Sequence, residues 1–182
     1  MRTVYLGLGT NLEDRDRWLD EGLKLLEGRL VEQRSIRAMT LSPRYETDAW
    51  GMAEGTPAFL NMVVALETNM PLPELLSLVL DIERECGRVR PARAEGYTNR
   101  TLDLDVLCTE NGETWNGKAT NGQQLEVPHP RMTARRFVLQ PLSDLDPNLL
   151  LDGTTVAQAL QACDTEPAVR LHVPTTQPSE RT

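Results

Sequence analysis

Apolar and polar residues alternate along the chain with two periods, one typical of strands and one typical of helices. Period-two alternation or short apolar runs predict strands over residues 3–9, 31–41 with a continuation at 44–47, 58–67 and 102–107. Apolar residues at helical spacing predict two intervening helices, from Asp14 or Asp16 to about Leu30 and from Pro71 or Pro73 to Gly87. The order β-α-β-β-α-β predicts an α+β, ferredoxin-like fold, an antiparallel sheet with helices packed on it.

The remaining segments are more polar and predict loops and accessory C-terminal elements. Residues 48–57 and 88–99 indicate two loops, and the repeated Asn-Gly pairs within residues 110–124 indicate a hairpin. Thr133 is a possible cap for a helix that continues through Leu139, and residues 156–160 predict a last short helix. We expect residues 1–163 to form a single domain and residues 164–182 to form a flexible C-terminal tail.

Composition and charge narrow the class of protein. The chain has 182 residues, 40% of them hydrophobic, which is enough for one globular domain with a real core. Its formal net charge of -8 argues against non-specific binding to nucleic acid. The three cysteines are widely spaced and predict neither a disulfide framework nor a metal site. No signal peptide or membrane span is predicted, so the cytoplasm is the expected location.

The strand predicted at residues 102–107 carries the clearest indication of chemistry. Leu102, Leu104 and Val106 would share one face, which leaves Asp103 and Asp105 with Leu107 on the other face. Two like charges there repel each other, and a bound cation relieves the repulsion. Mg²⁺ prefers oxygen ligands and often binds through one or two carboxylates together with substrate phosphates. A solvated strand edge is the alternative interpretation of the same pair.

Arginines cluster around this strand in the sequence, at Arg88, Arg90, Arg93 and Arg100. A guanidinium group can bind two phosphate oxygens at once, which makes arginine well suited to phosphate recognition. Paired carboxylates for a metal and adjacent arginines for phosphate together predict a metal–nucleotide site.

Several short motifs follow one another between the N-terminus and about residue 150. They are Gly7-x-Gly9-Thr10-Asn11-Leu12, Ser42-x-x-Tyr45-Glu46-Thr47, Trp50-Gly51, Phe59-Leu60-Asn61, Ile82-Glu83 with Gly87-Arg88-Val89-Arg90, Arg100-Thr101-Leu102-Asp103-Leu104-Asp105, Val127-Pro128-His129-Pro130-Arg131-Met132 and Arg135-x-Phe137-Val138-Leu139-x-Pro141-Leu142. Each motif is weak by itself, but their occurrence in this order is highly specific. Together they resemble the 6-hydroxymethyl-7,8-dihydropterin pyrophosphokinase family of folate biosynthesis.

The resemblance implies an enzyme that transfers pyrophosphate from ATP to the hydroxymethyl oxygen of a reduced pterin and releases AMP. It implies that Asp103 and Asp105 hold two Mg²⁺ ions along the triphosphate, during an in-line attack on the β-phosphorus. By the same resemblance the catalytic set also contains three arginines, Arg88, Arg90 and Arg100. The residues implied to contact ATP are Glu83, Arg88, Arg90, Tyr97, Arg100, His129 and Arg135.

The pterin is a flat heterocycle, which needs aromatic faces and a few placed polar groups. The resemblance implies that Phe59 and Phe137 stack on the ring and that Asn61 reads its edge, with Thr47 and Trp50 completing the edge contacts. Without the resemblance, ordinary core packing is the preferred interpretation of both phenylalanines. An asparagine inside an apolar strand is harder to explain by packing, because a buried amide needs partners.

The loop before the acidic strand departs from the family pattern. Gly96-Tyr97-Thr98-Asn99 stands where many members have Arg-Trp-Gly-Pro, so Tyr97 is expected to replace the tryptophan. This change is the only support for an alternative, a non-catalytic nucleotide- or pterin-binding sensor. A second alternative is a Mg²⁺-dependent phosphohydrolase, for which the sequence offers no identifiable base. The expected partners are the small-molecule substrates, with no nucleic acid, membrane or obligate protein partner.

Overall fold

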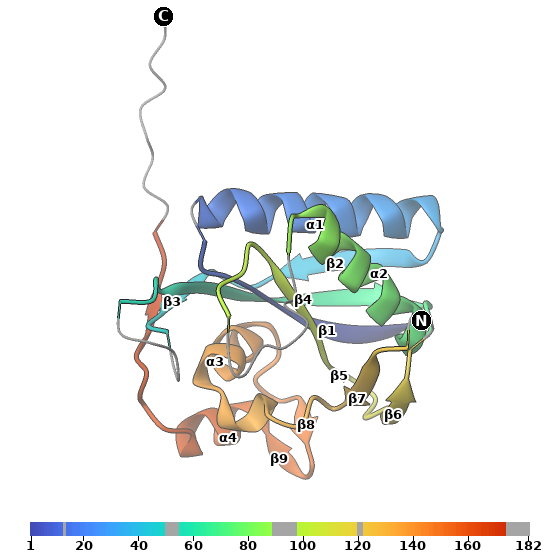
Figure 1. The fold of residues 1–182 in the computed structure, drawn as a ribbon. Coiled ribbons are helices and arrows are strands. Elements are labelled where there is room, and N and C mark those ends of the chain that lie inside the picture. The colour runs from blue at the N-terminus through green and yellow to red at the C-terminus, as the bar shows by residue number, and fades with distance from the viewer. Residues whose placement is uncertain (13, 50–54, 89–97, 120–121, 174–182) are drawn as a thin grey trace, which may run out of the picture.

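The computed structural model describes residues 1–12, 14–49, 55–88, 98–119 and 122–173 (Figure 1). The elements in chain order are β1 (Arg2–Thr10), α1 (Arg15–Glu32), β2 (Ile36–Leu41), β3 (Tyr45–Thr47), β4 (Phe59–Thr68), α2 (Leu72–Glu85), β5 (Asp103–Thr109), β6 (Trp115–Lys118), β7 (Gln124–Val127), the 3₁₀ helix η1 (Met132–Ala134), α3 (Arg136–Leu145), β8 (Leu150–Leu151), β9 (Thr154–Thr155), α4 (Val156–Ala162) and β10 (Val169–Leu171). Within these ranges, no helix is both long and apolar enough to cross a membrane.

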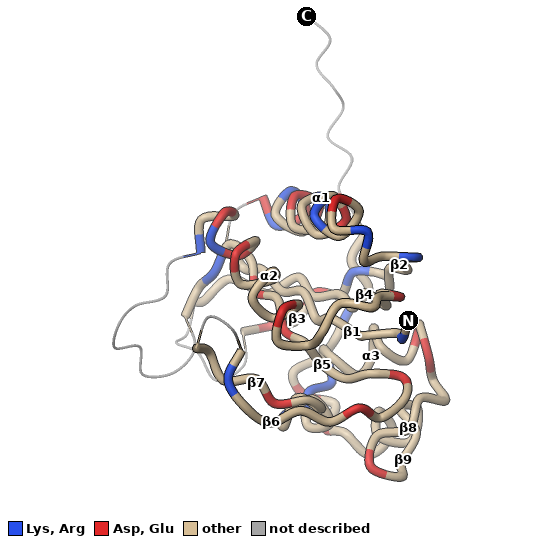
Figure 2. The backbone as a smooth tube through the Cα atoms, turned by 90° about the vertical axis from the view of Figure 1, so that its right-hand side faces the viewer, with Lys and Arg blue, Asp and Glu red and all other residues tan. Residues whose placement is uncertain are grey.

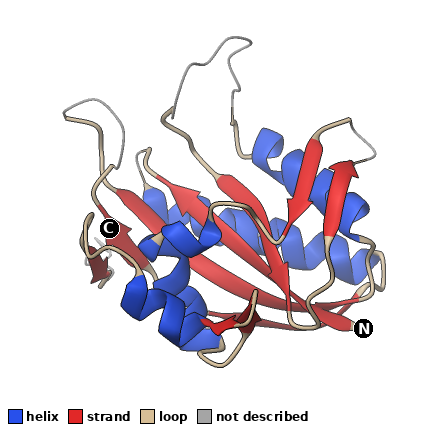
Figure 3. Ribbon diagram, turned by 90° about the horizontal axis from the view of Figure 1, so that it is seen from below, coloured by secondary structure: helices blue, strands red, loops and turns tan. Residues whose placement is uncertain are grey.

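A six-stranded antiparallel sheet forms the centre of the molecule (Figures 1 and 3). Its order is β10-β3-β4-β1-β5, and β2 pairs with β4 farther along the edge that β3 also occupies. Helices follow β1 and β4, the two central strands. This arrangement confirms the predicted α+β, ferredoxin-like fold.

Helices α1 and α2 cover one face of the sheet, the upper face in Figure 1. Alternate residues of the central strands point toward them, because side chains on a strand alternate between faces. The aliphatic core on this face includes Val4, Leu6 and Leu8 of β1, Leu60 and Val64 of β4, Leu104 and Val106 of β5, Leu19 and Leu26 of α1, and Leu75 and Val79 of α2. Charged residues of both signs alternate along α1, as Figure 2 shows, which is typical of a solvated helix face.

Helices α3 and α4 lie on the opposite face (Figure 1). Two buried tyrosines anchor the end of α3 to the sheet: the Tyr5 hydroxyl donates to Asp146 at 3.0 Å, and the Tyr45 hydroxyl donates to Asp144 at 2.6 Å. The smaller core on this face includes Val63 of β4. These two hydrogen bonds hold the C-terminal end of α3 against the sheet. The helix covers only part of this sheet face.

The end of α1 and the start of β2 differ from the sequence expectation. The strand expected from residue 31 begins at Ile36, because α1 continues to Glu32 and includes Val31. Arg34 then adopts a positive φ of 52°, and the Ser35 amide donates to the Leu30 carbonyl at 3.0 Å. A left-handed turn of this kind ends the helix and removes residues 33–35 from any strand.

The accessory elements also correct two expectations. The helix expected to start near Thr133 starts at Arg136, because residues 132–134 form a 3₁₀ turn and Arg135 is extended. The sheet continues beyond residue 163, because β10 pairs with β3 inside the stretch expected to be a flexible tail. The expected hairpin after residue 110 is confirmed as β6 and β7.

Candidate active site

A cavity of about 560 Å³ lies on the sheet face that α3 leaves partly uncovered. Gly7 and Gly9 of β1 form its floor: Gly9 lies between Asn61 of β4 and Asp103 of β5, and Gly7 lies beside Asp105. Because glycine has no side chain, the cavity reaches the β1 backbone between these polar groups. A Cβ atom on Gly9 would lie only 3.0 Å from the Asn61 Oδ1 atom.

The charged residues of the cavity come from four separate segments of the chain. They are Arg88 after α2, Arg100, Asp103 and Asp105 at the start of β5, Arg131 beside η1, and Arg135 before α3. The lining therefore has more basic than acidic side chains, although the whole protein has a net charge of -8. A local excess of positive charge in a cleft favours an anionic ligand.

Glu83 organises the wall of the cavity from inside α2. Its side chain is 1% exposed, accepts from the Leu104 backbone amide at 2.8 Å and pairs with the Arg88 guanidinium. Arg88 also donates to Asp103 and, at 3.3 Å, to the Leu102 carbonyl. Glu83 is not among the described residues that line the cavity. It instead holds Arg88 and the start of β5 in place.

Arg100 joins the acidic strand to an aromatic ring. Its Nε atom lies 3.2 Å from the Asp103 Oδ2 atom, and its guanidinium carbon lies 5.0 Å from the centre of the Phe59 ring. Arg135 makes a similar contact with Phe137, at 5.7 Å. Cation–π contacts of this kind hold a guanidinium group over a ring face. Phe59 and Phe137 therefore each support one arginine.

The two aspartates respond to their surroundings in opposite ways. Burial alone would raise the pKa of Asp103, but the charges of Arg100 and Arg88 lower it below the ordinary value. Burial and the neighbouring Asp103 charge raise the pKa of Asp105 to about 6, despite opposing effects of nearby arginines. The charge of Asp103 is thus balanced by Arg88 and Arg100, whereas ionisation of Asp105 is unfavourable. A bound cation would make ionisation of Asp105 more favourable.

His129 lines the cavity as a neutral ring. Burial and the charges of Arg135 and Arg131 lower the pKa of His129 to about 4. Its Nδ1 atom accepts from the Arg131 backbone amide at 3.2 Å, and its own amide donates to the Leu107 carbonyl at 2.6 Å. With Nδ1 accepting, the ring proton belongs on Nε2, which leaves a neutral donor.

A metal site built from protein ligands alone is absent from the described residues, since no group of three or more His, Cys, Asp or Glu side chains is placed to hold one ion. Asp103 and Asp105 still offer two carboxylates on one sheet face. A Mg²⁺ ion that takes its remaining ligands from water and phosphate needs no third carboxylate. The donor set therefore fits a nucleotide-associated ion.

Comparison with known proteins connects this cavity to an enzyme family. The family profile described as 7,8-dihydro-6-hydroxymethylpterin-pyrophosphokinase matches residues 5–147. The chain belongs to this family. A pyrophosphokinase of Pseudomonas aeruginosa is 41% identical over 172 residues, covering 94% of this chain and 98% of the relative. One of Porphyromonas gingivalis is 39% identical over 155 residues, covering 85% and 98%. Both are named 2-amino-4-hydroxy-6-hydroxymethyldihydropteridine pyrophosphokinases.

Solved structures support the fold independently. A structure of an HPPK-DHPS protein with substrates has a TM-score of 0.62 at 14% identity, and the match covers 88% of this chain. The chain spans only 43% of that longer protein. Wild-type HPPK-DHPS of Plasmodium falciparum gives a TM-score of 0.60, with 88% of this chain and 41% of that chain covered. As a pyrophosphokinase, the chain is an ATP-dependent transferase.

Of the residues expected to bind the pterin, Asn61 and Phe137 line the cavity, and Thr47 contacts Asn61. Asn61 lines the cavity and donates through Nδ2 to the Thr47 hydroxyl at 3.2 Å. Phe137 also lines the cavity, whereas Phe59 contacts Arg100 and is not among the described lining residues. Three further expected site residues, Trp50, Arg90 and Tyr97, lie outside the described residues.

Asn11, which follows β1 in this pyrophosphokinase, makes buried contacts that the sequence did not predict. It is 1% exposed; its Nδ2 atom donates to Asn99 Oδ1 at 2.8 Å and to the Pro57 carbonyl at 3.4 Å. Its Oδ1 atom accepts from the Arg100 backbone amide at 2.9 Å. One side chain thus fixes the ends of both predicted loops. In the sequence Asn11 is only one member of the motif Gly7-x-Gly9-Thr10-Asn11-Leu12, and nothing in that motif indicates which segments its side chain joins.

Proposed function

We propose that this enzyme transfers the pyrophosphoryl group of ATP to the hydroxymethyl oxygen of 6-hydroxymethyl-7,8-dihydropterin, giving AMP and the pterin diphosphate, in folate biosynthesis. One arrangement supports it above all others. Asp103 and Asp105 face Asn61 across a glycine floor, within a cavity that is lined by arginines. A cavity with a phosphate-binding end and an amide-bearing end suits a reaction between a nucleotide and a heterocycle.

Asp103 and Asp105 are the residues that would hold Mg²⁺, with two ions expected. When bound, Mg²⁺ neutralises phosphate charge and favours ionisation of the attacking hydroxyl group. The raised pKa of Asp105, about 6, is consistent with this role, because its unfavourable charge would be relieved by a cation. Asp103 is already balanced by Arg88 and Arg100. Binding a cation there would release guanidinium donors toward phosphate oxygens.

The arginines would bind and orient the triphosphate for an in-line attack on the β-phosphorus. Arg100, which contacts Phe59 and Asp103, would turn toward the phosphates when a cation binds, whereas Arg88 is preorganised by Glu83. Donors that are already fixed stabilise developing charge without a reorganisation cost. Arg135 and the Nε2 proton of His129 would contact ATP from the side of α3, and Arg90 and Tyr97 complete the proposed ATP set. Glu83 would act through Arg88.

The pterin would occupy the end of the cavity at β4 and α3. Asn61 has one amide proton committed to Thr47, so its other donor and its carbonyl are oriented to pair with the heterocycle edge. Phe137 offers a ring face in the cavity wall. Phe59 would complete the stack if Arg100 turns toward phosphate, and Trp50 would contribute from the adjoining loop. We place this reaction in the cytoplasm, where ATP is supplied.

Product analysis tests this proposal directly. Purified protein would be incubated with ATP, Mg²⁺ and 6-hydroxymethyl-7,8-dihydropterin, with controls that omit the pterin or the metal. We expect equal amounts of AMP and pterin diphosphate, and neither product in the controls. Pterin binding without AMP would favour the sensor. Phosphate release without pterin would favour the phosphohydrolase.

A further inference from the structure

Strand β10 and the adjoining His172, residues 169–172, lie outside the family match at residues 5–147. This segment adds β10 to the outer edge of β3, with Val169 opposite Thr47 and Leu171 opposite Tyr45. The segment continues the ladder at His172, whose amide donates to the Arg44 carbonyl at 2.9 Å. Without β10, the three-residue β3 would be paired with β4 alone. Such a short edge strand has few hydrogen bonds to define its position.

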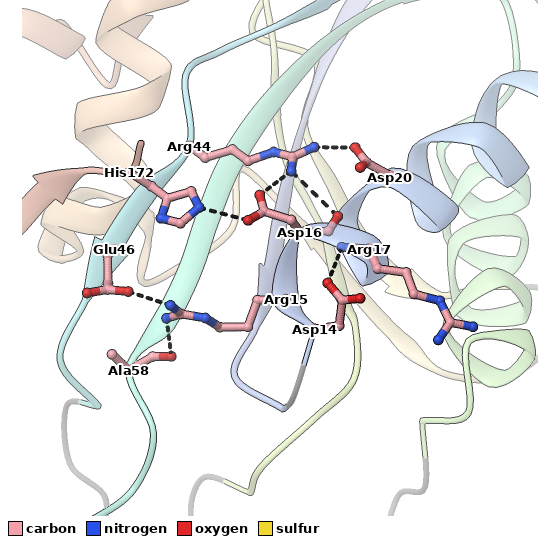
Figure 4. Close-up of polar contacts among 9 residues, drawn as sticks. All are labelled: Asp14, Arg15, Asp16, Arg17, Asp20, Arg44, Glu46, Ala58 and His172. Carbon is pink, nitrogen blue, oxygen red and sulfur yellow. Dashed lines mark hydrogen bonds and ion pairs between the residues drawn. The ribbon is translucent and has the colours of Figure 1, made fainter. Parts of the chain in front are cut away.

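His172 also fastens this segment to the start of α1, as Figure 4 shows. Its Nε2 atom lies 2.8 Å from the Asp16 Oδ2 atom, and the His172 side chain is only 14% exposed. The Arg44 guanidinium contacts Asp16 and also Asp20. Burial would raise the pKa of Asp16, yet hydrogen bonds from Arg44 and His172 lower it. Asp16 therefore stays ionised as a shared acceptor between α1, β3 and the C-terminal segment.

The same end of α1 holds both strands that flank residues 48–58. The Arg15 guanidinium pairs with Glu46 of β3 and donates to the Ala58 carbonyl at 2.9 Å, just before β4 (Figure 4). Next to Glu46, Thr47 accepts the hydrogen bond from Asn61. Arg170 reaches Asp48 at 3.1 Å, but both side chains are more than half exposed, and such a surface pair contributes little.

We propose that residues 169–172 position β3, and through Thr47 the Asn61 amide, so that the C-terminal strand is a positioning element for the pterin subsite. This inference rests on the proposed function, in which Asn61 reads the pterin edge. The path is continuous: His172 to Asp16 and Arg44, the β10 ladder to β3, and Thr47 to Asn61. The carboxylates and Arg88 lie on the other side of β1 and do not depend on this path.

The hydrogen-bond alternation of antiparallel strands supplies matched proline variants of the full chain. Because the His172 amide points toward β3, the Arg170 amide also points toward β3, whereas the Leu171 amide points outward. Arg170→Pro removes one ladder hydrogen bond, and Leu171→Pro removes none. Arg170→Ala controls for the lost contact with Asp48. We expect Arg170→Pro to raise the pterin KM about tenfold and to change the ATP KM less than twofold. Leu171→Pro and Arg170→Ala should match the wild type.

Loss of folded protein is distinguishable from loss of positioning, because a smaller folded fraction lowers the apparent kcat and leaves both KM values unchanged. That result, or an equal rise in both KM values, would overturn the inference. If Arg170→Pro does not fold, His172→Ala keeps the backbone ladder and should raise the pterin KM about threefold. His172→Gln, whose amide can still donate to Asp16, should restore most of the loss. An unchanged pterin KM in His172→Ala would also overturn it.

Asn61→Ala separates this inference from the proposed function. If Asn61→Ala raises the pterin KM and the β10 variants do not, the positioning role of β10 is wrong and the pterin subsite stands. If Asn61→Ala leaves the pterin KM unchanged, the assignment of the subsite itself is wrong.

Discussion

The two faces of the central sheet are built from the same strands and carry opposite chemistry. Toward α1 and α2, β1 presents Val4, Leu6 and Leu8, none of them more than 2% exposed. Toward the cavity, the same strand presents Gly7 and Gly9. Strand β5 repeats the contrast, with leucine and valine on the first face and aspartates on the second. The first face is filled by aliphatic side chains, whereas the second packs against α3 and α4 in part and is open over Gly7 and Gly9.

The first face mainly contributes free energy of folding, whereas the second face carries the charged groups of the active site. Close packing of the filled face supplies burial that stabilises the domain. That stability allows like charges to converge on the other face, where the raised pKa of Asp105 reports an unfavourable interaction. Variants on the two faces should therefore change different measured quantities.

Asp105→Ala should give the largest effect on the cavity face. We expect turnover to fall at least about 100-fold, because one of the two carboxylates proposed to hold Mg²⁺ beside the phosphates is lost. Pterin affinity, measured by titration with a non-hydrolysable ATP analogue present, should change less than about threefold. Unchanged turnover would refute the metal assignment.

Leu6→Ala on the filled face is the matched control for that variant. Leu6 is fully buried, so its truncation should lower the free energy of unfolding by about 2–5 kcal/mol. Turnover per folded molecule should stay near the wild-type value, as judged by kcat corrected for the folded fraction. A large loss of corrected kcat would show that the two faces are not separable.

Asp105→Asn should stabilise the protein above pH 6 in the absence of Mg²⁺. The pKa of Asp105 is raised from 3.8 to about 6 on folding, so its favourable contribution exists below pH 4 and is lost as the pH rises through 6. Asparagine does not undergo this loss. Denaturant unfolding should show a stability gain of up to about 3 kcal/mol at pH 7.5 that shrinks toward pH 4.

Asp103→Asn should show the opposite sign in the same experiment. The pKa of Asp103 is lowered in the folded protein, so its contribution is present above its unfolded pKa and is lost at lower pH. Replacing it should destabilise the protein near pH 7.5, because Arg88 and Arg100 lose their shared acceptor. If both variants shift stability in the same direction, the assignment of opposite environments is wrong.

Local alternation explains why so much of the cavity could be predicted from sequence. Period two places Asp103 and Asp105 on one face of β5, and the order of elements brings β5 next to β1. Pairing between segments that are distant in the sequence leaves no such pattern. Val169 and Thr47, for example, are far apart in the sequence and pair on adjacent strands. Glu83 was expected at the nucleotide, but only tertiary contacts reveal that it holds Arg88 and Leu104.

Gly9→Ala tests the cavity face with a single methyl group. The new Cβ would lie 3.0 Å from Asn61 Oδ1, so the amide must move by a few tenths of an ångström. We expect the pterin KM to rise about tenfold, equivalent to 1.4 kcal/mol. Gly7→Ala is the control, because its Cβ would meet only the Leu107 side chain at an ordinary 3.4 Å. Equal KM values in both variants would show that the floor at Gly9 is not needed.

Substitutions at two glycines of α1 have the smallest expected effects. They test how tightly the sheet face toward α1 and α2 is packed. A Cβ atom added at Gly28 would meet nothing within 4 Å beyond its own stretch of helix, so Gly28→Ala should stabilise the protein by about 0.5–1 kcal/mol through helix propensity. At Gly22 the Cβ would lie 2.6 Å from the Leu102 Cδ2 atom, and Leu102 is fully buried. The clash should outweigh the same propensity gain, so Gly22→Ala should lower stability by about 1 kcal/mol. Thermal unfolding of both variants measures the difference, and equal stabilisation would mean that the core beneath α1 can yield.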